Sequence, residues 1–223
     1  MPVLVFALII LILAPSIWVR LVLKRYSHER SDLAGTGDEL ARHLLDKHGA
    51  PDVQVESIDK NDHHYDPNNK AVRLGPQSYQ AKSLTAVAIA AHEVGHALAY
   101  HNEDKVTLLS KRYAPLARLV RRLAISLLMF WPAISVLIHI PYAVPLHALV
   151  VFISGFCLAF VYLAMLPEEW DASFNKALPI LLEGRYLAPE DYPKIKKILT
   201  ACALTYVAQA LLNVLFFWRW FRR

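Results

Sequence analysis

The sequence has 223 residues, a formal net charge of +5 and a mean hydropathy of +0.31, and 56% of its residues are hydrophobic. This composition excludes a disordered or collagen-like chain. It also exceeds the apolar share of about 45–50% that is usual in soluble domains, so it favours a membrane protein. The basic balance suggests lipid headgroups rather than nucleic acid as a partner, since no base-reading motif is present. Cys157 and Cys202 both lie in apolar runs, which excludes a disulfide framework and a cysteine-rich metal site.

Long apolar segments predict a multi-pass helical membrane protein in contact with the lipid bilayer. Residues 3–19 are predominantly apolar, and positive residues follow them rather than precede them, which predicts a retained anchor. Residues 123–166 contain no charged side chain, and as one helix of 44 residues they would extend about 66 Å, about twice the bilayer core. We therefore expect them to fold back near Pro141 and Pro145 into two spans.

The distribution of basic residues predicts the orientation of the chain. Of the 24 basic residues, sixteen lie between Arg20 and Arg122 and five between Lys176 and Lys197, so both polar segments are expected to face the cytoplasm. The predicted layout is an N-terminal transmembrane anchor (1–23), a cytoplasmic segment (24–118), a two-span transmembrane hairpin (119–166), a second cytoplasmic segment (167–197) and a C-terminal transmembrane or interfacial helix (198–223).

The first polar segment contains signals for a helix and for short strands. Thr36 and Glu39 have the spacing of a capping box, and the helix that they open is expected to end near Gly49. Residues 53–58 alternate like a strand, and a turn at 66–69 leads into a second strand at 71–74. These features predict a small antiparallel hairpin.

The motif His-Glu-Val-Gly-His lies within a run from Ser83 to Tyr100 that has the composition of a buried helix. His92 and His96 are four residues apart, so their rings project from one face of a helix and can bind one Zn²⁺. Glu93 lies beside that face, where it can act as a general base on a metal-bound water. Gly95 inside the helix suggests that another backbone or the substrate approaches closely.

A catalytic zinc centre usually has three protein ligands, so one more residue is needed. The best source is the segment 166–173, where the chain is expected to return from the membrane to the cytoplasmic side and to begin another helix. From helix logic alone, Glu168 and Glu169 are equally good candidates for the third ligand.

Several motifs resemble the YugP-like neutral zinc metallopeptidases, which are bacterial membrane proteins. The resemblance covers most of residues 30–180 and rests on residues 63–67, 72–74, 79, 83, 90–97 and 166–173. It implies that Glu169, which precedes an aromatic residue, is the third zinc ligand. In the related HtpX-like proteases an Asp takes the place of Ser173 and orients a ligand histidine, so the resemblance implies a similar but weaker role for Ser173.

The sequence therefore predicts a membrane-bound zinc metalloendopeptidase of the bacterial inner membrane, with one Zn²⁺ per chain and its site on the cytoplasmic side. The expected fold is mainly α, a multi-pass helical membrane protein with a zincin-like cytoplasmic core that carries a small β-hairpin or sheet. The expected substrates are peptides or membrane proteins. An intramembrane zinc protease and a non-catalytic zinc-binding scaffold remain as alternatives.

Two further segments near the motif have open interpretations. Residues 72–74 are either an edge strand that binds an extended peptide or a covered structural strand. His63, His64 and Tyr65 are either oxyanion donors or part of a structural turn.

Overall fold

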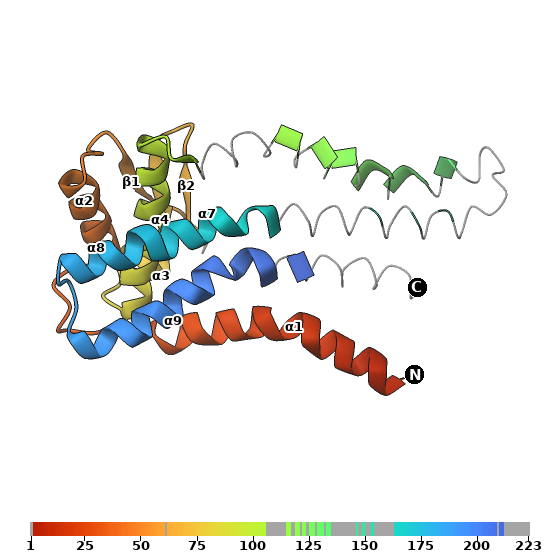
Figure 1. The fold of residues 1–223 in the computed structure, drawn as a ribbon, viewed down its shortest axis with the longest axis horizontal. Coiled ribbons are helices and arrows are strands. Elements are labelled where there is room, and N and C mark those ends of the chain that lie inside the picture. Colours follow the sequence, from red (N-terminus) through yellow and green to blue (C-terminus); the bar gives the residue numbers. More distant parts are fainter. Residues whose placement is uncertain are drawn as a thin grey trace. The chain divides into compact units, whose positions relative to one another are not determined.

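The computed structural model describes residues 2–60, 62–105, 163–208, 210 and 211, together with isolated positions between 115 and 153. Within these residues the protein is mainly helical and has a sheet of three strands (Figure 1). The helices are α1 (Pro2–Arg25), α2 (Gly37–Lys47), α3 (Pro76–Tyr79), α4 (Leu84–His101), α7 (Leu166–Trp170), the π-helix η1 (Asp171–Ala177), α8 (Leu178–Glu183), the 3₁₀-helix η2 (Pro189–Asp191) and α9 (Tyr192–Ala203). The strands are β1 (Gln54–Ser57), β2 (His64–Asp66) and β3 (Ala71–Leu74).

The chain divides into two compact units. One consists of residues 17–108 and 167–205, and it contains the sheet and every candidate site residue. The other consists of residues 1–16, 109–166 and 206–223, and much of it lies outside the described residues. In this second unit the hydroxyl of Ser16 donates to the carbonyl oxygen of Ala208 at 3.4 Å.

The expected multi-pass membrane fold is wrong for the part of the chain that the structure describes. No helix there is both long enough and apolar enough to cross a bilayer. One physical reason is that apolar residues are buried within the protein itself: Val19 and Val22, near the end of the expected anchor, belong to the hydrophobic core. The expected two-span hairpin at 119–166 falls mostly outside the described residues, as does the end of the C-terminal helix expected at 198–223.

Helix α2 begins and ends where its sequence signals predicted. The backbone N–H of Thr36 donates to the carboxylate of Glu39 at 2.9 Å, which is half of the reciprocal bonding of a capping box. The helix ends at Lys47, and Gly49 adopts a φ of +81°, a left-handed conformation that glycine adopts without strain.

The sheet differs from the predicted hairpin in its pairing. Strand β3 lies in the centre of the order β1-β3-β2, parallel to β1 and antiparallel to β2. The predicted turn exists, because the Asp66 carboxylate accepts from the backbone N–H of Asn68 at 2.9 Å, but it joins β3 to β2 rather than to β1. Strand β2 has only three residues and no alternating apolar pattern, so periodicity could not identify it. The edge-strand interpretation of residues 72–74 is therefore wrong, and the covered structural strand is correct.

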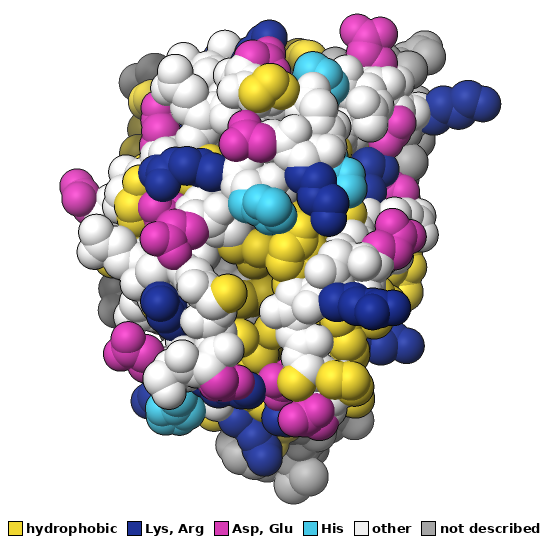
Figure 2. Space-filling model, turned by 90° about the vertical axis from the view of Figure 1, so that its left-hand side faces the viewer, with side chains coloured by type: hydrophobic (Ala, Val, Ile, Leu, Met, Phe, Trp, Pro, Cys, Tyr) yellow, Lys and Arg dark blue, Asp and Glu magenta, His cyan; other side chains and the backbone are white. Residues whose placement is uncertain are grey.

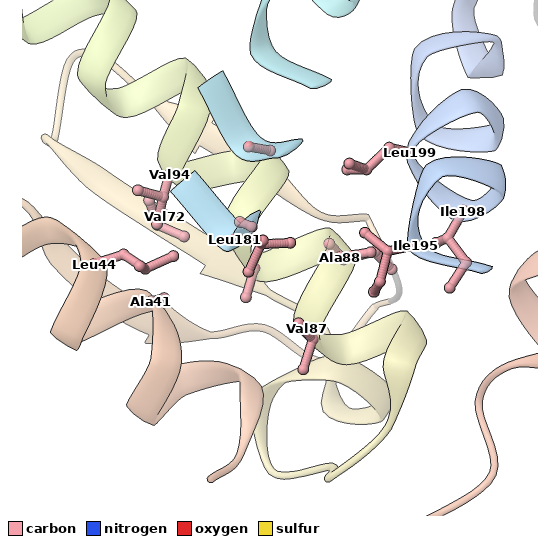
Figure 3. Close-up of a cluster of buried hydrophobic side chains, with 14 of the residues drawn as sticks. Ala41, Leu44, Val72, Val87, Ala88, Val94, Leu181, Ile195, Ile198 and Leu199 are labelled. Carbon is pink, nitrogen blue, oxygen red and sulfur yellow. The ribbon is translucent and has the colours of Figure 1, made fainter. Parts of the chain in front are cut away.

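Helix α4 is the centre of the core and is buried along almost its whole length. Its small and branched residues pack against α2, β3, α8 and α9, and Figure 3 shows this contact through Val87, Val94, Leu44, Leu181 and Ile195. Ser83 caps the helix by accepting the backbone N–H of Ala86 at 3.1 Å. An apolar, capped helix held on several sides is a rigid support for the side chains that it carries.

The surface around α2 and α8 carries mixed charge. Figure 2 shows acidic and basic side chains interspersed around a central strip of apolar side chains on this face. Within α2, for example, Arg42 pairs with Asp38 at 2.7 Å. Charges on this face are thus balanced locally rather than collected into a region of one sign.

Candidate metal centre

The two motif histidines lie on one face of α4, as the spacing predicted. The centroids of the His92 and His96 rings are 4.7 Å apart and the ring planes are nearly perpendicular. His92 is buried, and the side chain of His96 is 12% exposed. Both rings present Nε2 to the same carboxylate oxygen, Oε2 of Glu169, at 3.2 Å from His92 and 3.5 Å from His96.

The three side chains fit a zinc ion by donor chemistry and spacing. One donor atom from each of His92, His96 and Glu169 lies within 4.8 Å of the other two. Zinc binds His nitrogen and carboxylate oxygen at about 2.0–2.2 Å, so tetrahedral ligands lie about 3.3 Å from one another. The two nitrogen-to-oxygen distances are close to that separation. Two nitrogens and one oxygen also leave the fourth position of a tetrahedron open.

The structure distinguishes the two glutamates that were equally good candidates for the third ligand in the sequence. Glu168 is also buried, but its Oε1 lies 3.9 Å from Nδ1 of His96, on the other side of that ring from Nε2. Glu169 alone of the two lies where the Nε2 atoms of both histidines converge. The geometry therefore agrees with the ligand that the family resemblance implied.

Strong electrostatic coupling holds His96 and Glu169 together. Burial opposes the charge of His96, but the carboxylates of Glu169, Glu93 and Glu168 together outweigh this effect and raise the pKa of His96 to about 9. Burial likewise opposes the charge of Glu169, but the two histidines outweigh it and lower the pKa of Glu169 to about 2. A positive charge is thus favoured at this position, and a proton on His96 supplies it when no metal is bound.

Glu93 lies beside the histidines without joining the group of three. It is 5% exposed, and burial raises the pKa of its carboxyl group even though His92 and His96 act in the opposite direction. A raised pKa makes a carboxylate a stronger base.

The segment that carries Glu169 approaches α4 at Gly95. A Cβ atom at position 95 would lie 2.6 Å from the carbonyl oxygen of Ala172, which is closer than side-chain atoms can come to backbone. The close backbone approach that this glycine suggested in the sequence is therefore confirmed. Ala172 belongs to the π-helix η1, and turns of this kind occur frequently at functional sites.

Ser173 follows Ala172 in η1 and is completely buried. Its Oγ lies 3.0 Å from Nδ1 of His92 and donates to the carbonyl oxygen of Leu199 at 3.2 Å. The contact with His92 agrees with the role that the resemblance implied for Ser173. Neither the π-helix nor the contribution of Leu199 in α9 was predicted, because no local pattern in the sequence encodes either.

A partly buried ion-pair network lies next to the centre. Lys176 of η1 pairs with Asp171 at 2.5 Å and with Asp104, just beyond α4, at 2.7 Å. The network therefore joins the end of α4 to η1.

The residues before β2 and in it are held by structural contacts. Nδ1 of His63 accepts the backbone N–H of Gly75 at 3.0 Å, and burial lowers the pKa of His63 to about 4. Nδ1 of His64 lies 2.8 Å from the carbonyl oxygen of Asp62, and the ring of Tyr65 contacts Tyr100. These contacts support the structural-turn interpretation of His63 and His64.

Comparison with known proteins identifies the family. The chain is 31% identical over 204 residues to a Bacillus subtilis (strain 168) protein named "Putative membrane protease YugP", and the match covers 89% of this chain and 87% of the relative. No solved structure matches the chain. The profile of a family described as "Putative neutral zinc metallopeptidase" matches residues 1–223. The chain therefore belongs to this family of neutral zinc metallopeptidases, as its motifs suggested.

Proposed function

We propose that the protein is a zinc-dependent endopeptidase in which His92, His96 and Glu169 hold the metal. The observation that carries this proposal is the convergence of both Nε2 atoms on Oε2 of Glu169, at 3.2 and 3.5 Å. Zinc, when bound, supplies a Lewis acid that polarises the scissile carbonyl and activates water. The remaining chemistry belongs to the side chains around it.

Glu93 is the proposed general base. It directly follows the first ligand on α4, and its burial favours proton uptake. Glu93 takes a proton from the attacking water and then delivers it to the amine that leaves when the peptide bond breaks. A carboxylate with a raised pKa suits both steps, since it must gain a proton and lose it again near neutral pH.

Strand β2 is the proposed docking site for the substrate backbone. Because β3 is central, the free edges of the described sheet belong to β1 and β2. The ring of Tyr65 in β2 contacts that of Tyr100 in α4, with centroids 5.5 Å apart, so β2 lies against the helix that carries His92 and His96. An extended peptide can add to such an edge through main-chain hydrogen bonds.

The proposed substrates are peptides, including segments of membrane proteins. The Bacillus relative is named as a membrane protease, and main-chain recognition at a strand edge requires only an extended segment rather than a particular folded partner.

Replacing Glu93 tests the enzymatic function. In Glu93→Gln, zinc content measured by metal analysis should remain at one ion per chain, whereas casein cleavage should fall by at least about 100-fold, as expected for loss of a general base. The matched control is Glu183→Gln, which changes an exposed glutamate at the end of α8 and should affect neither quantity. If Glu93→Gln cleaved casein at the wild-type rate, Glu93 would not be the general base. If the zinc-loaded wild type cleaved no casein, the protein would be a zinc-binding scaffold rather than a peptidase.

A further inference from the structure

The side chain of Arg73, in the central strand of the sheet, pairs with a carboxylate on each side. The register places Arg73 opposite Glu56 of β1. Its Nε donates to Oε2 of Glu56 at 2.9 Å, and its Nη1 donates to Oδ2 of Asp66 in β2 at 2.6 Å. One side chain of the central strand therefore holds both outer strands.

These ion pairs lie on the face of the sheet that points away from the core. Val72 and Leu74 are completely buried in the core, and successive side chains of a strand point to opposite faces, so Arg73 points the other way. Tyr65 of β2 is paired with Val72 and contacts Tyr100 of α4 on the core side. Strand β2 is thus held from both faces, by an aromatic contact toward α4 and by an ion pair on the opposite side.

The carboxylate of Asp66 also organises the turn that follows β2. It accepts from the backbone N–H of Asn68 at 2.9 Å and from the side-chain amide of Asn69 at 2.7 Å. The side chain of Asp66 is 15% exposed and that of Arg73 is 24% exposed, so water screens their charges only in part. The end of β2 is therefore fixed by charge-assisted hydrogen bonds.

Strand β2 needs such support because it is short. It has three residues, whereas strands of about five or six residues are typical. It is also an outer strand of the described sheet, so β3 is its one strand partner there. A strand that is already fixed in the extended conformation binds a peptide backbone more tightly, because less conformational entropy is lost on binding.

We propose that Arg73 is a positioning residue that holds β2, through the ion pair with Asp66, in the extended conformation to which a substrate peptide adds. This inference rests on the proposed docking of the substrate at β2. Glu56 anchors the guanidinium group from the opposite side. The planar guanidinium group can serve two carboxylates at once, whereas lysine has a single charged nitrogen.

The test measures peptide binding to the full chain, loaded with zinc and carrying Glu93→Gln so that a bound peptide is not cleaved. The probe is a fluorescein-labelled casein fragment, and its dissociation constant is measured by fluorescence anisotropy. Adding Arg73→Gln should raise this constant about 10-fold, because the peptide must then bind a strand whose backbone is no longer fixed. Arg73→Lys keeps the charge but not the two-sided contact, so it should raise the constant about threefold.

Replacing the partner carboxylate tests whether Arg73 acts through Asp66. Asp66→Asn keeps an acceptor for the turn but removes the charge, so it should weaken peptide binding as much as Arg73→Gln does. The two substitutions together should weaken binding little more than either one, because each removes the same interaction. Fully additive losses would contradict the proposed route through Asp66.

The matched control is Arg30→Gln. Arg30 also pairs with two carboxylates, those of Asp32 and Asp191, and its side chain is 30% exposed, but neither partner lies in the sheet. Arg30→Gln should lower thermal stability and leave the dissociation constant of the peptide within about twofold of its starting value.

Amide hydrogen exchange gives a second readout that needs no peptide. The backbone amides of residues 64–66 should exchange faster in Arg73→Gln than in wild type, and at the wild-type rate in Arg30→Gln. Unchanged peptide binding or unchanged exchange in Arg73→Gln would overturn the inference. So would equal losses of binding in Arg73→Gln and Arg30→Gln, or a zinc-loaded Glu93→Gln protein that binds no peptide. A wild type that binds the peptide but cleaves no casein would defeat only the proposed peptidase function.

Discussion

The two segments that form the candidate metal centre are built in different ways. Helix α4 is a regular α-helix of 18 residues, and it places His92 and His96 one turn apart on the same face. The segment Leu166–Ala177 changes from α-helix to π-helix directly after Glu169 and Trp170. The first segment encodes its contribution in local spacing, whereas the second depends on how closely it packs against α4. Substitutions in the two segments should therefore affect metal binding for different reasons.

The largest effect should distinguish the two adjacent glutamates. Glu169→Ala removes the carboxylate on which both Nε2 atoms converge, so its loss of zinc affinity should exceed the 10- to 100-fold typical of indirect contacts. Glu168→Ala should cause a smaller loss. Metal analysis after dialysis measures both, and loss of zinc in Glu168→Ala alone would refute the ligand assignment.

The packing of the segment Leu166–Ala177 against α4 can be disrupted by a substitution at Gly95, which leaves every candidate ligand in place. A methyl group at position 95 would meet the Ala172 carbonyl and push η1 away from α4. Gly95→Ala should lower the free energy of unfolding by about 1–3 kcal/mol, although alanine is the better helix former, and should also weaken zinc binding.

A glycine substitution elsewhere in the same helix serves as the control for Gly95→Ala. Ala88→Gly should also destabilise α4, by about 1 kcal/mol or more, yet leave the approach of η1 unchanged. Chelator competition and urea unfolding on both variants would compare the effects. Equal zinc affinities in the two variants would show that the close approach at Gly95 does not matter for the centre.

The pH dependence of zinc binding tests the coupling between the two segments. Without metal, His96 keeps its proton up to a pKa of about 9 because Glu169 stabilises the charge. Zinc must displace that proton, so affinity should rise about tenfold per pH unit below pH 9 and level off above it. Glu169, with a pKa of about 2, is ionised throughout and adds no slope. Titrations at several pH values measure this, and a flat profile between pH 6 and pH 8 would contradict the raised pKa.

The smallest expected effect concerns the ion pairs that join η1 to the end of α4. Lys176→Met leaves Asp171 and Asp104 without their shared partner, and the free energy of unfolding should fall by about 1 kcal/mol because water still screens part of the network. The control, Lys70→Met, breaks an exposed pair with Asp52 and should have almost no effect in urea unfolding.

Features that are encoded within a short stretch of sequence were predicted correctly, whereas features that depend on contacts between distant segments were not. The capped start of α2, the buried α4 and the role of Gly95 were predicted, because caps, helical spacing and an unusual glycine are encoded within a few residues. Glu168 and Glu169 were equally good candidates for the third ligand in the sequence. The helical pattern alone does not show which of two adjacent residues faces a histidine that is distant in the sequence. Resemblance to a family favoured Glu169, and the geometry agrees.

Two predictions about the fold were wrong for physical reasons. The hairpin was assigned to residues 53–58, which alternate, and to residues 71–74, which follow a turn. The antiparallel partner of β3 is instead β2, which is only three polar and aromatic residues long. Hydropathy also led to a multi-pass membrane fold, yet no described helix meets the requirements for crossing a bilayer. Composition cannot distinguish apolar residues buried in lipid from those buried in protein, as Val19 and Val22 illustrate.

The division of the chain into units has a consequence for how the centre tolerates change in length. His96 and Glu169 lie in the same unit, but the stretch 109–166 between them in the sequence belongs to the other one. A cation held by both residues would therefore join two parts of this unit that residues 109–166 separate in the sequence. The entropic cost of bringing the ends of a flexible chain segment together rises by only about 0.6 kcal/mol with each doubling of its length. Changes in the number of residues between the two ligands are therefore expected to cost the centre little.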